Sequence, residues 1–68
     1  MENIHDILIL LNMANRDAID YGRNNVTKII NSNMIAVGAE SWSIENRSDK
    51  LSIEFTLFHQ HYRQEYVV

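Results

Sequence analysis

The chain has 68 residues, of which 46% are hydrophobic and 22% are charged, and its formal net charge is −3. These proportions are typical of a folded globular protein and argue against intrinsic disorder. Lysine and arginine are scattered along the sequence without a basic run, so nucleic acid is not an expected partner.

The length predicts one small domain spanning residues 1–68. A domain of this size buries only about 60% of the surface that its unfolded chain exposes, so its stability alone is marginal. Small domains usually compensate with disulfides, a bound metal or self-association. Because the sequence has no cysteine, self-association is the expected device.

The apolar run Ile7–Leu11 lacks the features of a targeting signal. It follows the acidic residues Glu2 and Asp6 instead of a basic segment, and no small-residue cleavage site comes after it. The run is also much shorter than the ~20 apolar residues of a membrane-spanning helix. We therefore expect a cytoplasmic protein with no membrane partner.

An amphipathic helix is predicted from Asn3 onward, because apolar residues recur at steps of three and four. These residues are Ile4, Ile7, Leu8, Leu11, Ala14, Ala18 and Tyr21. The Asn3 side chain is suited to cap the helix. The negative charge of Asp6, in the first turn, interacts favourably with the partial positive charge at the helix N-terminus. Ile9, Leu10 and Met13 lie outside the stripe, which implies a second contact surface for another copy of the chain.

Gly22 leaves the end of this helix open to three interpretations. The apolar stripe resumes in phase at Val26, which favours a helix that continues, straight or kinked, to Ser32, because tertiary packing can override the cost of one glycine. Alternatively, Asn24–Asn25 caps a second short helix, or residues 26–30 form a strand.

Residues 34–57 are predicted to form an antiparallel β-hairpin around a polar turn at residues 46–49, because apolar and polar residues alternate on both sides of it. Residues 31–33 form the turn that leads into the hairpin. The predicted register pairs Glu45 with Lys50, Ile44 with Leu51, Trp42 with Ile53 and Glu40 with Phe55. It gives one polar face and one apolar face, with Trp42 in the core.

From Leu51 to Val68 no glycine or proline interrupts the chain. This stretch exceeds the usual strand length of ~3–10 residues, so a bend or bulge is expected near His59–His61. The end of the chain is then either a third strand or an arm. The predicted fold class is α+β, with an N-terminal helix, continuous or kinked near Gly22, packed on an antiparallel β-hairpin with a third C-terminal strand.

His59 and His61 are the sharpest candidates for metal chemistry, since residues two apart on a strand point to one face. Zinc needs a third or fourth ligand, which only His5, Glu65 or a second copy could supply, so ordinary half-exposed histidines are the favoured interpretation. Glu40 falls on the predicted covered face, and a sheet edge or bulge at this residue is favoured over a buried carboxylate with a catalytic role.

The sequence contains no nucleophile elbow, no phosphate-binding glycine loop and no compelling pair of carboxylates. We therefore expect neither an enzyme nor a cofactor.

The segment from His59 to Tyr66 alternates aromatic and hydrogen-bonding side chains, a composition typical of recognition surfaces. Tyr62 and Tyr66 are as well suited to completing the core or a self-interface as to binding a partner. The candidate residues for binding a partner or ligand are His59, His61, Tyr62, Arg63 and Tyr66. The candidate dimer-interface residues, chosen among the excess apolar positions, are Ile9, Met13, Ile35, Val37 and Phe58.

The expected function is stoichiometric protein binding by a small accessory or inhibitory homodimer. Richness in asparagine and isoleucine suits an AT-rich genome, such as that of a phage or mobile element that inhibits a host defence or regulatory protein. One alternative is a homo-oligomer that sequesters a small anionic ligand, such as a signalling nucleotide, with Arg63, His59, His61 and Tyr62. The second alternative is an intersubunit metal site at the two histidines.

Overall fold

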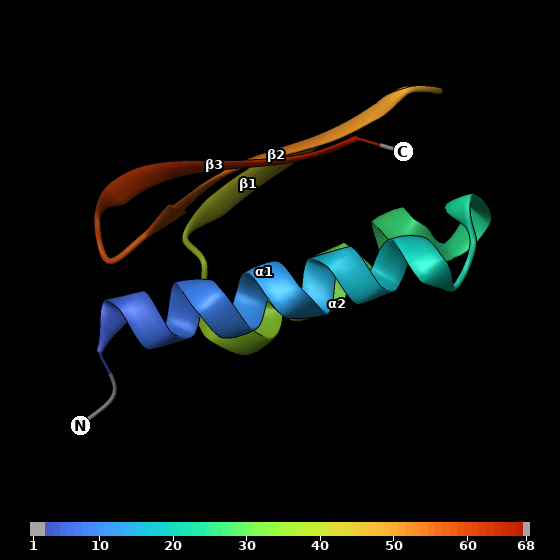
Figure 1. The fold of residues 1–68 in the computed structure, drawn as a ribbon. Helices are drawn as coiled ribbons and strands as arrows, with labels where there is room; N and C mark the ends of the chain where they lie inside the picture. The colour runs from blue at the N-terminus through green and yellow to red at the C-terminus, as the bar shows by residue number, and fades with distance from the viewer. Residues whose placement is uncertain (1–2, 68) are drawn as a thin grey trace. The chain divides into compact units, whose positions relative to one another are not determined.

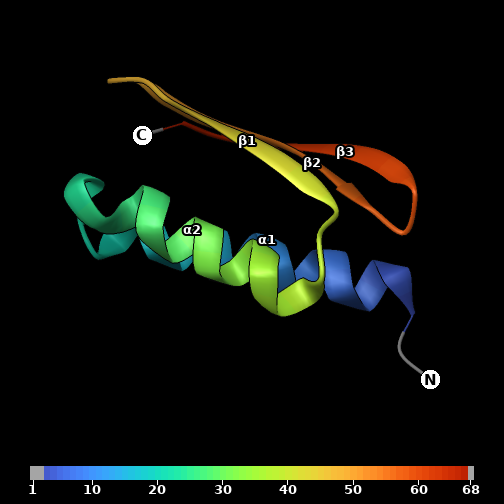
Figure 2. The same ribbon diagram turned by 180° about the vertical axis from the view of Figure 1, so that it is seen from behind.

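A computed structural model describes residues 3–67 of the chain. Its elements are, in chain order, α1 (Ile4–Asp20), α2 (Arg23–Val37), β1 (Ser41–Asn46), β2 (Lys50–Leu57) and β3 (Gln60–Val67). The chain divides into a helical unit of residues 1–37 and a sheet unit of residues 38–68, and each is described by itself (Figures 1 and 2). The predicted α+β class is confirmed, whereas a single domain over residues 1–68 stays a prediction.

Helix α1 begins where the sequence predicts, because Asn3 caps it. Asn3 has an extended backbone (φ −82°, ψ 142°), and its side-chain oxygen accepts a hydrogen bond from the His5 backbone N–H at 3.0 Å. Its carbonyl oxygen accepts from the backbone N–H groups of Asp6 and Ile7. The bonds from His5 and Asp6 satisfy donors that the first turn of a helix otherwise leaves without partners, and the bond from Ile7 is the first regular bond of the helix.

The prediction of one helix through Gly22 is wrong, because α1 ends at Asp20 and α2 begins at Arg23. Gly22 has φ +108°, a conformation that residues with a Cβ rarely adopt, and it allows the chain to reverse. Figures 1 and 2 show that α1 and α2 run antiparallel, side by side. The apolar stripe therefore resumes after Gly22 because each helix presents an apolar side to the other.

Helix α2 continues to Val37, so the predicted turn at residues 31–33 and the predicted strand over residues 34–39 are also wrong. Its buried residues are Val26, Ile30 and Met34. Because these residues are four apart, the buried side of the helix continues beyond residue 33. The apolar residues in 34–39 follow the helical repeat and therefore fit no single face of a strand. Gly38, with φ +76°, follows the last residue of the helix.

A buried amide lies among the apolar side chains of the helical unit. Asn15 has 0% of its surface exposed, as do Ala18 and Ile30, and its Oδ1 accepts a hydrogen bond from Asn33 Nδ2 at 3.0 Å. A buried amide without a partner is costly, so the contact favours the one alignment of α1 against α2 that provides it.

The sheet has the order β1-β2-β3, and both strand pairs are antiparallel. The predicted β1–β2 register is wrong by two residues, because Trp42 lies opposite Phe55 instead of Ile53. The Arg47 N–H donates to the Lys50 carbonyl oxygen at 2.9 Å, which closes a tighter loop than the one predicted. A slip of two residues leaves strand side chains on their predicted faces.

The apolar face of the sheet is formed mainly by β2 and β3. Its buried residues are Leu51, Ile53, Phe55, Leu57 and Tyr66. Trp42, predicted in the core, is only half-buried, in agreement with its place on an edge strand.

The C-terminal segment forms a third strand and not an arm, and the expected bend is a two-residue turn at Phe58 and His59. Both turn residues have positive φ, 52° and 65°. Two-residue hairpin turns with positive φ at both positions favour Asn-Gly, because a bulky side chain is disfavoured in the left-handed region. The turn therefore keeps two unfavourable residues at the end of the hairpin.

Replacing Asn15 by alanine should lower the free energy of unfolding by about 1–3 kcal/mol, because the Asn33 amide loses a buried acceptor. Urea denaturation followed by circular dichroism measures the change. Asp17→Ala, at an exposed position of the same helix, should change it by less than about 0.5 kcal/mol. Equal effects of the two substitutions would show that the amide contact contributes nothing.

Replacing Phe58 and His59 together by Asn-Gly should raise the free energy of unfolding by about 1 kcal/mol or more, because both residues then suit positive φ. The urea midpoint is the measurement. The reversed pair, Gly-Asn at the same positions, is the matched control and should stabilise less. A loss of stability with Asn-Gly would show that Phe58 packs in a way that outweighs its backbone cost.

Candidate functional site

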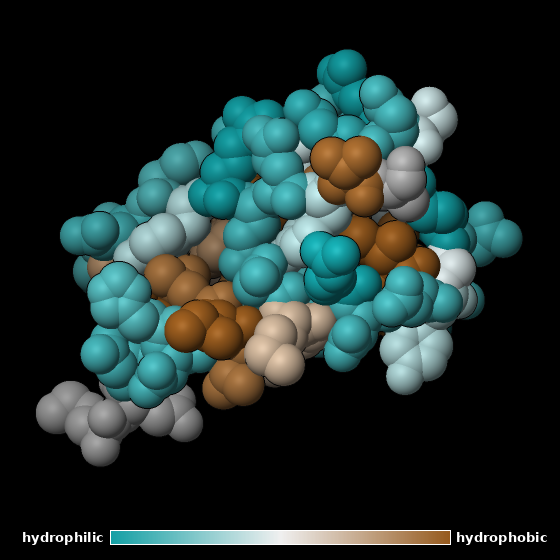
Figure 3. Space-filling model, viewed as in Figure 1, coloured by the Kyte–Doolittle hydropathy of each residue, from teal (hydrophilic) through white to brown (hydrophobic). Residues whose placement is uncertain are grey.

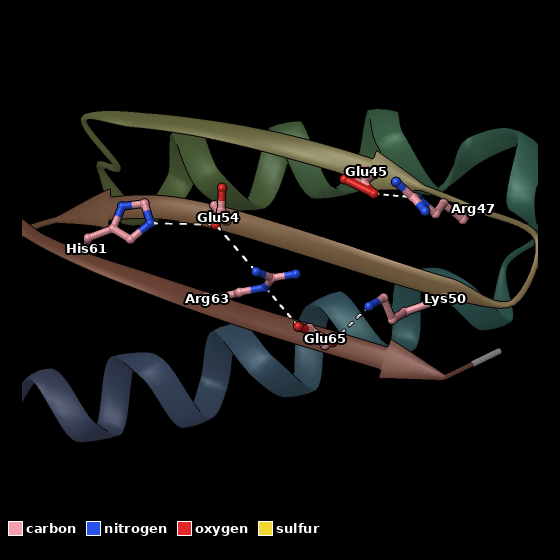
Figure 4. A network of polar contacts seen from close by, with 7 residues as sticks. All are labelled: Glu45, Arg47, Lys50, Glu54, His61, Arg63 and Glu65. Carbon is pink, nitrogen blue, oxygen red and sulfur yellow. Dashed lines mark ion pairs between the residues drawn. The ribbon is translucent and has the colours of Figure 1, made fainter.

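The polar face of the sheet collects hydrogen-bonding and charged side chains from all three strands. Alternate residues of a strand share a face, so the following side chains lie together: Ser43 and Glu45 of β1, Lys50, Ser52 and Glu54 of β2, and His61, Arg63 and Glu65 of β3. Figure 4 shows the charged members of β2 and β3 reaching toward one another, whereas Glu45 of β1 lies apart from them.

Arg63 lies at the centre of a chain of ion pairs on this face. Its Nε lies 2.8 Å from Glu65 Oε1, and its Nη1 lies 3.7 Å from Glu54 Oε1. Glu65 Oε2 continues the chain to Lys50 Nζ at 3.3 Å, and Glu54 Oε1 lies 4.0 Å from His61 Nε2. From Lys50 through Glu65 and Arg63 to Glu54, charges of opposite sign therefore alternate along the face.

A separate ion pair joins Glu45 to Arg47 beside the β1–β2 loop (Figure 4). The side chains in all these pairs are roughly half exposed, so each pair contributes only about 0–1 kcal/mol to stability. The network therefore adds little to the stability of the sheet.

Two pockets on the polar face are smaller than the sites that usually hold a nucleotide. One, of about 240 Å³, lies beside His61. The other has a volume of about 100 Å³ and is lined by Ser43, Glu45, Ser52, Glu54 and Arg63. Typical ligand sites measure roughly 300–1,000 Å³. Two lining residues of the smaller pocket are acidic, so its chemistry also disfavours an anion.

The five candidate binding residues are divided between two faces and a turn. His61 and Arg63 lie on the polar face, and His59 lies in the β2–β3 turn. Tyr62 and Tyr66 lie on the apolar face. The Tyr62 ring stacks on Phe55 at a centroid distance of 5.6 Å, and Tyr66, with 6% of its surface exposed, donates a hydrogen bond to the side chain of Gln64.

This division answers the question that the sequence left open for the tyrosines. Tyr66 belongs to the core, and Tyr62 is half-buried beside it. The recognition surface predicted along one continuous segment is therefore not brought together. Its polar members form the ion-pair network and its aromatic members support the sheet from the other side.

Glu40 lies just before β1 and is exposed, as the favoured edge interpretation requires. Its Oε1 accepts a hydrogen bond from the His59 backbone N–H at 3.2 Å and lies 3.2 Å from His59 Nδ1. The Glu40 N–H donates to the Thr56 carbonyl oxygen at 2.9 Å. The carboxylate thus reaches the β2–β3 turn, a contact that no short sequence pattern reveals.

His59 and His61 do not form the strand pair that a metal site would need. His59 lies in the turn beside Glu40, whereas His61 lies on the polar face beside Glu54. Within residues 3–67, no group of three or more histidine, cysteine, aspartate or glutamate residues is arranged to hold a metal ion.

The candidate dimer residues are mostly exposed, but they are spread over three elements. Ile9 and Met13 of α1 have 58% and 57% of their surface exposed, and Leu10 beside them has 62%. Apolar surface over α1 is visible in Figure 3. Ile35 of α2 and Phe58 of the turn are also exposed, at 69% and 59%. Val37 is half-buried.

An open groove of about 410 Å³ on the helical unit was not anticipated from the sequence. It is lined by Tyr21, Asn25, Lys28, Ile29, Ser32 and Asn33. These residues come from α2 and the end of α1, and the groove depends on the chain reversal at Gly22 that the sequence interpretation missed.

No protein-family model, curated protein or solved structure matches this chain. Among the described residues, no helix has both the length and the apolar character needed to cross a membrane.

Replacing Glu40 by alanine should speed hydrogen exchange at the His59 amide, because the turn loses the acceptor of its N–H. Glu40→Gln, which retains a side-chain oxygen, should keep most of the protection. Glu54→Ala removes a carboxylate from the polar face and serves as the control. Two-dimensional NMR measures all three, and equal exchange rates in Glu40→Ala and the wild type would contradict the role of Glu40.

Proposed function

We propose that this chain is a non-enzymatic accessory protein that binds a site on a larger protein in fixed stoichiometry and acts as a homodimer. The observation that carries the proposal is the exposed apolar cluster of Ile9, Leu10 and Met13 on α1. Ile9 and Met13 lie one helical turn apart on the same side of the helix, with Leu10 adjacent.

The cluster has the properties of a docking surface for an apolar pocket. Burying the exposed parts of these three side chains would contribute about 3–5 kcal/mol to a complex. Leu11 and Ala18, on the opposite side of α1, are buried at 2% and 0% exposure, so the helix already has its internal contact. Ile9, Leu10 and Met13 take no part in this contact, and a contiguous exposed apolar patch is typical of interaction sites.

The proposal extends to an inhibitory role against a host defence or regulatory protein, in a phage or mobile element. Its support is compositional, from the abundance of asparagine and isoleucine. The two alternatives have less support. His61 and Arg63 share the polar face, but Tyr62 lies on the apolar face and His59 lies in the β2–β3 turn. Neither the anion-binding set nor the two histidines therefore form one group. Cytoplasmic localisation is part of the same proposal.

Replacing Ile9 by glutamate should abolish capture of the partner by the purified protein, because a charge cannot enter an apolar pocket without a large desolvation cost. Native mass spectrometry of the captured complexes shows whether the partner is still bound and gives the stoichiometry of the complex. Thr27→Glu, an exposed position on α2 with the same change of charge, should leave capture intact. Unchanged capture by Ile9→Glu, with circular dichroism showing a folded protein, would contradict the proposed surface.

A further inference from the structure

Strand β3 is an edge strand with an ordered pattern of outward backbone groups. Within residues 3–67 it pairs with β2 and lies at the end of the order β1-β2-β3. An antiparallel ladder turns the N–H and C=O of alternate residues to alternate neighbours. Because the Arg47 N–H donates to the Lys50 carbonyl oxygen, the backbone groups of Lys50 and of the other even-numbered residues of β2 point toward β1. The backbone groups of the odd-numbered residues of β2 therefore point toward β3.

The same alternation fixes the direction of the β3 backbone. Leu57 pairs with Gln60 across the two-residue turn, and such a closing pair is normally hydrogen-bonded. The even-numbered residues of β3 therefore bond to β2. The backbone groups of His61, Arg63, Glu65 and Val67 turn to the outer edge, where another strand can bond to them.

The sequence of β3 is self-complementary about Gln64. It reads Tyr62-Arg63-Gln64-Glu65-Tyr66, so Arg63 and Glu65 are equidistant from the centre and have opposite charges. Tyr62 and Tyr66 are likewise equidistant. Suppose that two copies of β3 lie antiparallel about a two-fold axis at Gln64. The Arg63 of each copy then lies opposite Glu65 of the other copy, and the Tyr62 of each copy lies opposite Tyr66 of the other copy.

We propose that the outer edge of β3 is the dimer interface, with two copies paired antiparallel about Gln64 so that their sheets join into one continuous sheet. This inference rests on the self-association included in the proposed function, and it names the surface that performs it. It leaves the apolar cluster of α1 for the protein partner.

Neighbouring registers are disfavoured by charge and by backbone geometry. A two-fold axis at Arg63 or at Glu65 places two identical charges opposite each other, which destabilises a strand pair. A shift of the axis to a point between two residues sets an outward-facing residue against an inward-facing one, and the ladder cannot form. Among these registers, the one centred on Gln64 alone has both matched backbone groups and matched charges.

The ion pairs within one copy already hold the two charges in position. Arg63 Nε and Glu65 Oε1 are 2.8 Å apart on the same face, with Lys50 and Glu54 on β2 behind them. In the proposed dimer, four charges form a square of alternating sign, so each has an opposite charge beside it along its own strand and across the interface. The other edge strand, β1, has Glu45 as its only charged residue and offers no equivalent pairing.

The decisive test uses two charge variants and their mixture. Arg63→Glu gives a copy with two acidic residues at these positions, and Glu65→Arg gives a copy with two basic residues. Each should self-associate about tenfold more weakly or worse, since both cross-strand pairs become repulsive. Mixed in equal amounts they should form a heterodimer, because each acidic residue then faces a basic one.

The mixture separates the interface from effects within one chain. The ion pair between residues 63 and 65 of one copy is absent from both variants and is not restored by mixing. Sedimentation equilibrium measures the association, and native mass spectrometry with one variant isotopically labelled identifies the heterodimer. Circular dichroism confirms that each variant is folded.

A measurement on the wild type needs no variant. On raising the protein concentration, the amides of His61, Arg63 and Glu65 should gain protection from hydrogen exchange, whereas the Ile44 amide on the outer edge of β1 should not. A wild-type dimer that persists in both charge variants, without preference for the heterodimer, would overturn the β3 interface and leave self-association standing. A wild-type monomer would overturn both, while partner binding through α1 is judged separately by Ile9→Glu.

Discussion

The antiparallel ladder between β2 and β3 determines which face each side chain of the C-terminal strand occupies. Its starting point is the two-residue turn at Phe58 and His59. Once that turn closes, Arg63 must lie on the polar face with Glu54, and Tyr66 must lie on the apolar face with Leu51. The ion-pair network and the buried face of the sheet therefore have the same origin, and a shift of one residue would destroy both.

Side-chain periodicity was enough to predict much of the fold, because a repeat of two or of about four residues reports which face is buried. The hairpin faces are observed as predicted. Of the two alternatives for the C-terminal segment, the third strand is the one observed. The Asn3 cap, predicted from its residue type and not from periodicity, is also observed. The failures have local backbone causes. Periodicity is unaffected by a chain reversal that restores its phase, so it missed the turn at Gly22. It also missed a slip of two residues, since such a slip changes no face.

The candidate site was harder to predict than the fold, because it depends on pairings across strands. Arg63 and His61 were recognised as polar members of a surface, but their partner Glu54 lies on another strand and becomes apparent only with the correct register. The contact from Glu40 to the turn likewise joins residues 19 positions apart in sequence. The tyrosines were ambiguous because an aromatic residue on a strand suits a core and a binding surface equally.

The order of the elements has a further consequence for how the chain folds. Helix α1 pairs with α2, β1 with β2 and β2 with β3, so these contacts join consecutive elements along the chain. Short loops close with little loss of chain entropy, and proteins with mostly local contacts fold faster than those with distant pairings. Each unit can therefore assemble by closing turns between neighbouring elements. One of these turns contains Phe58, whose positive φ is disfavoured for a bulky side chain.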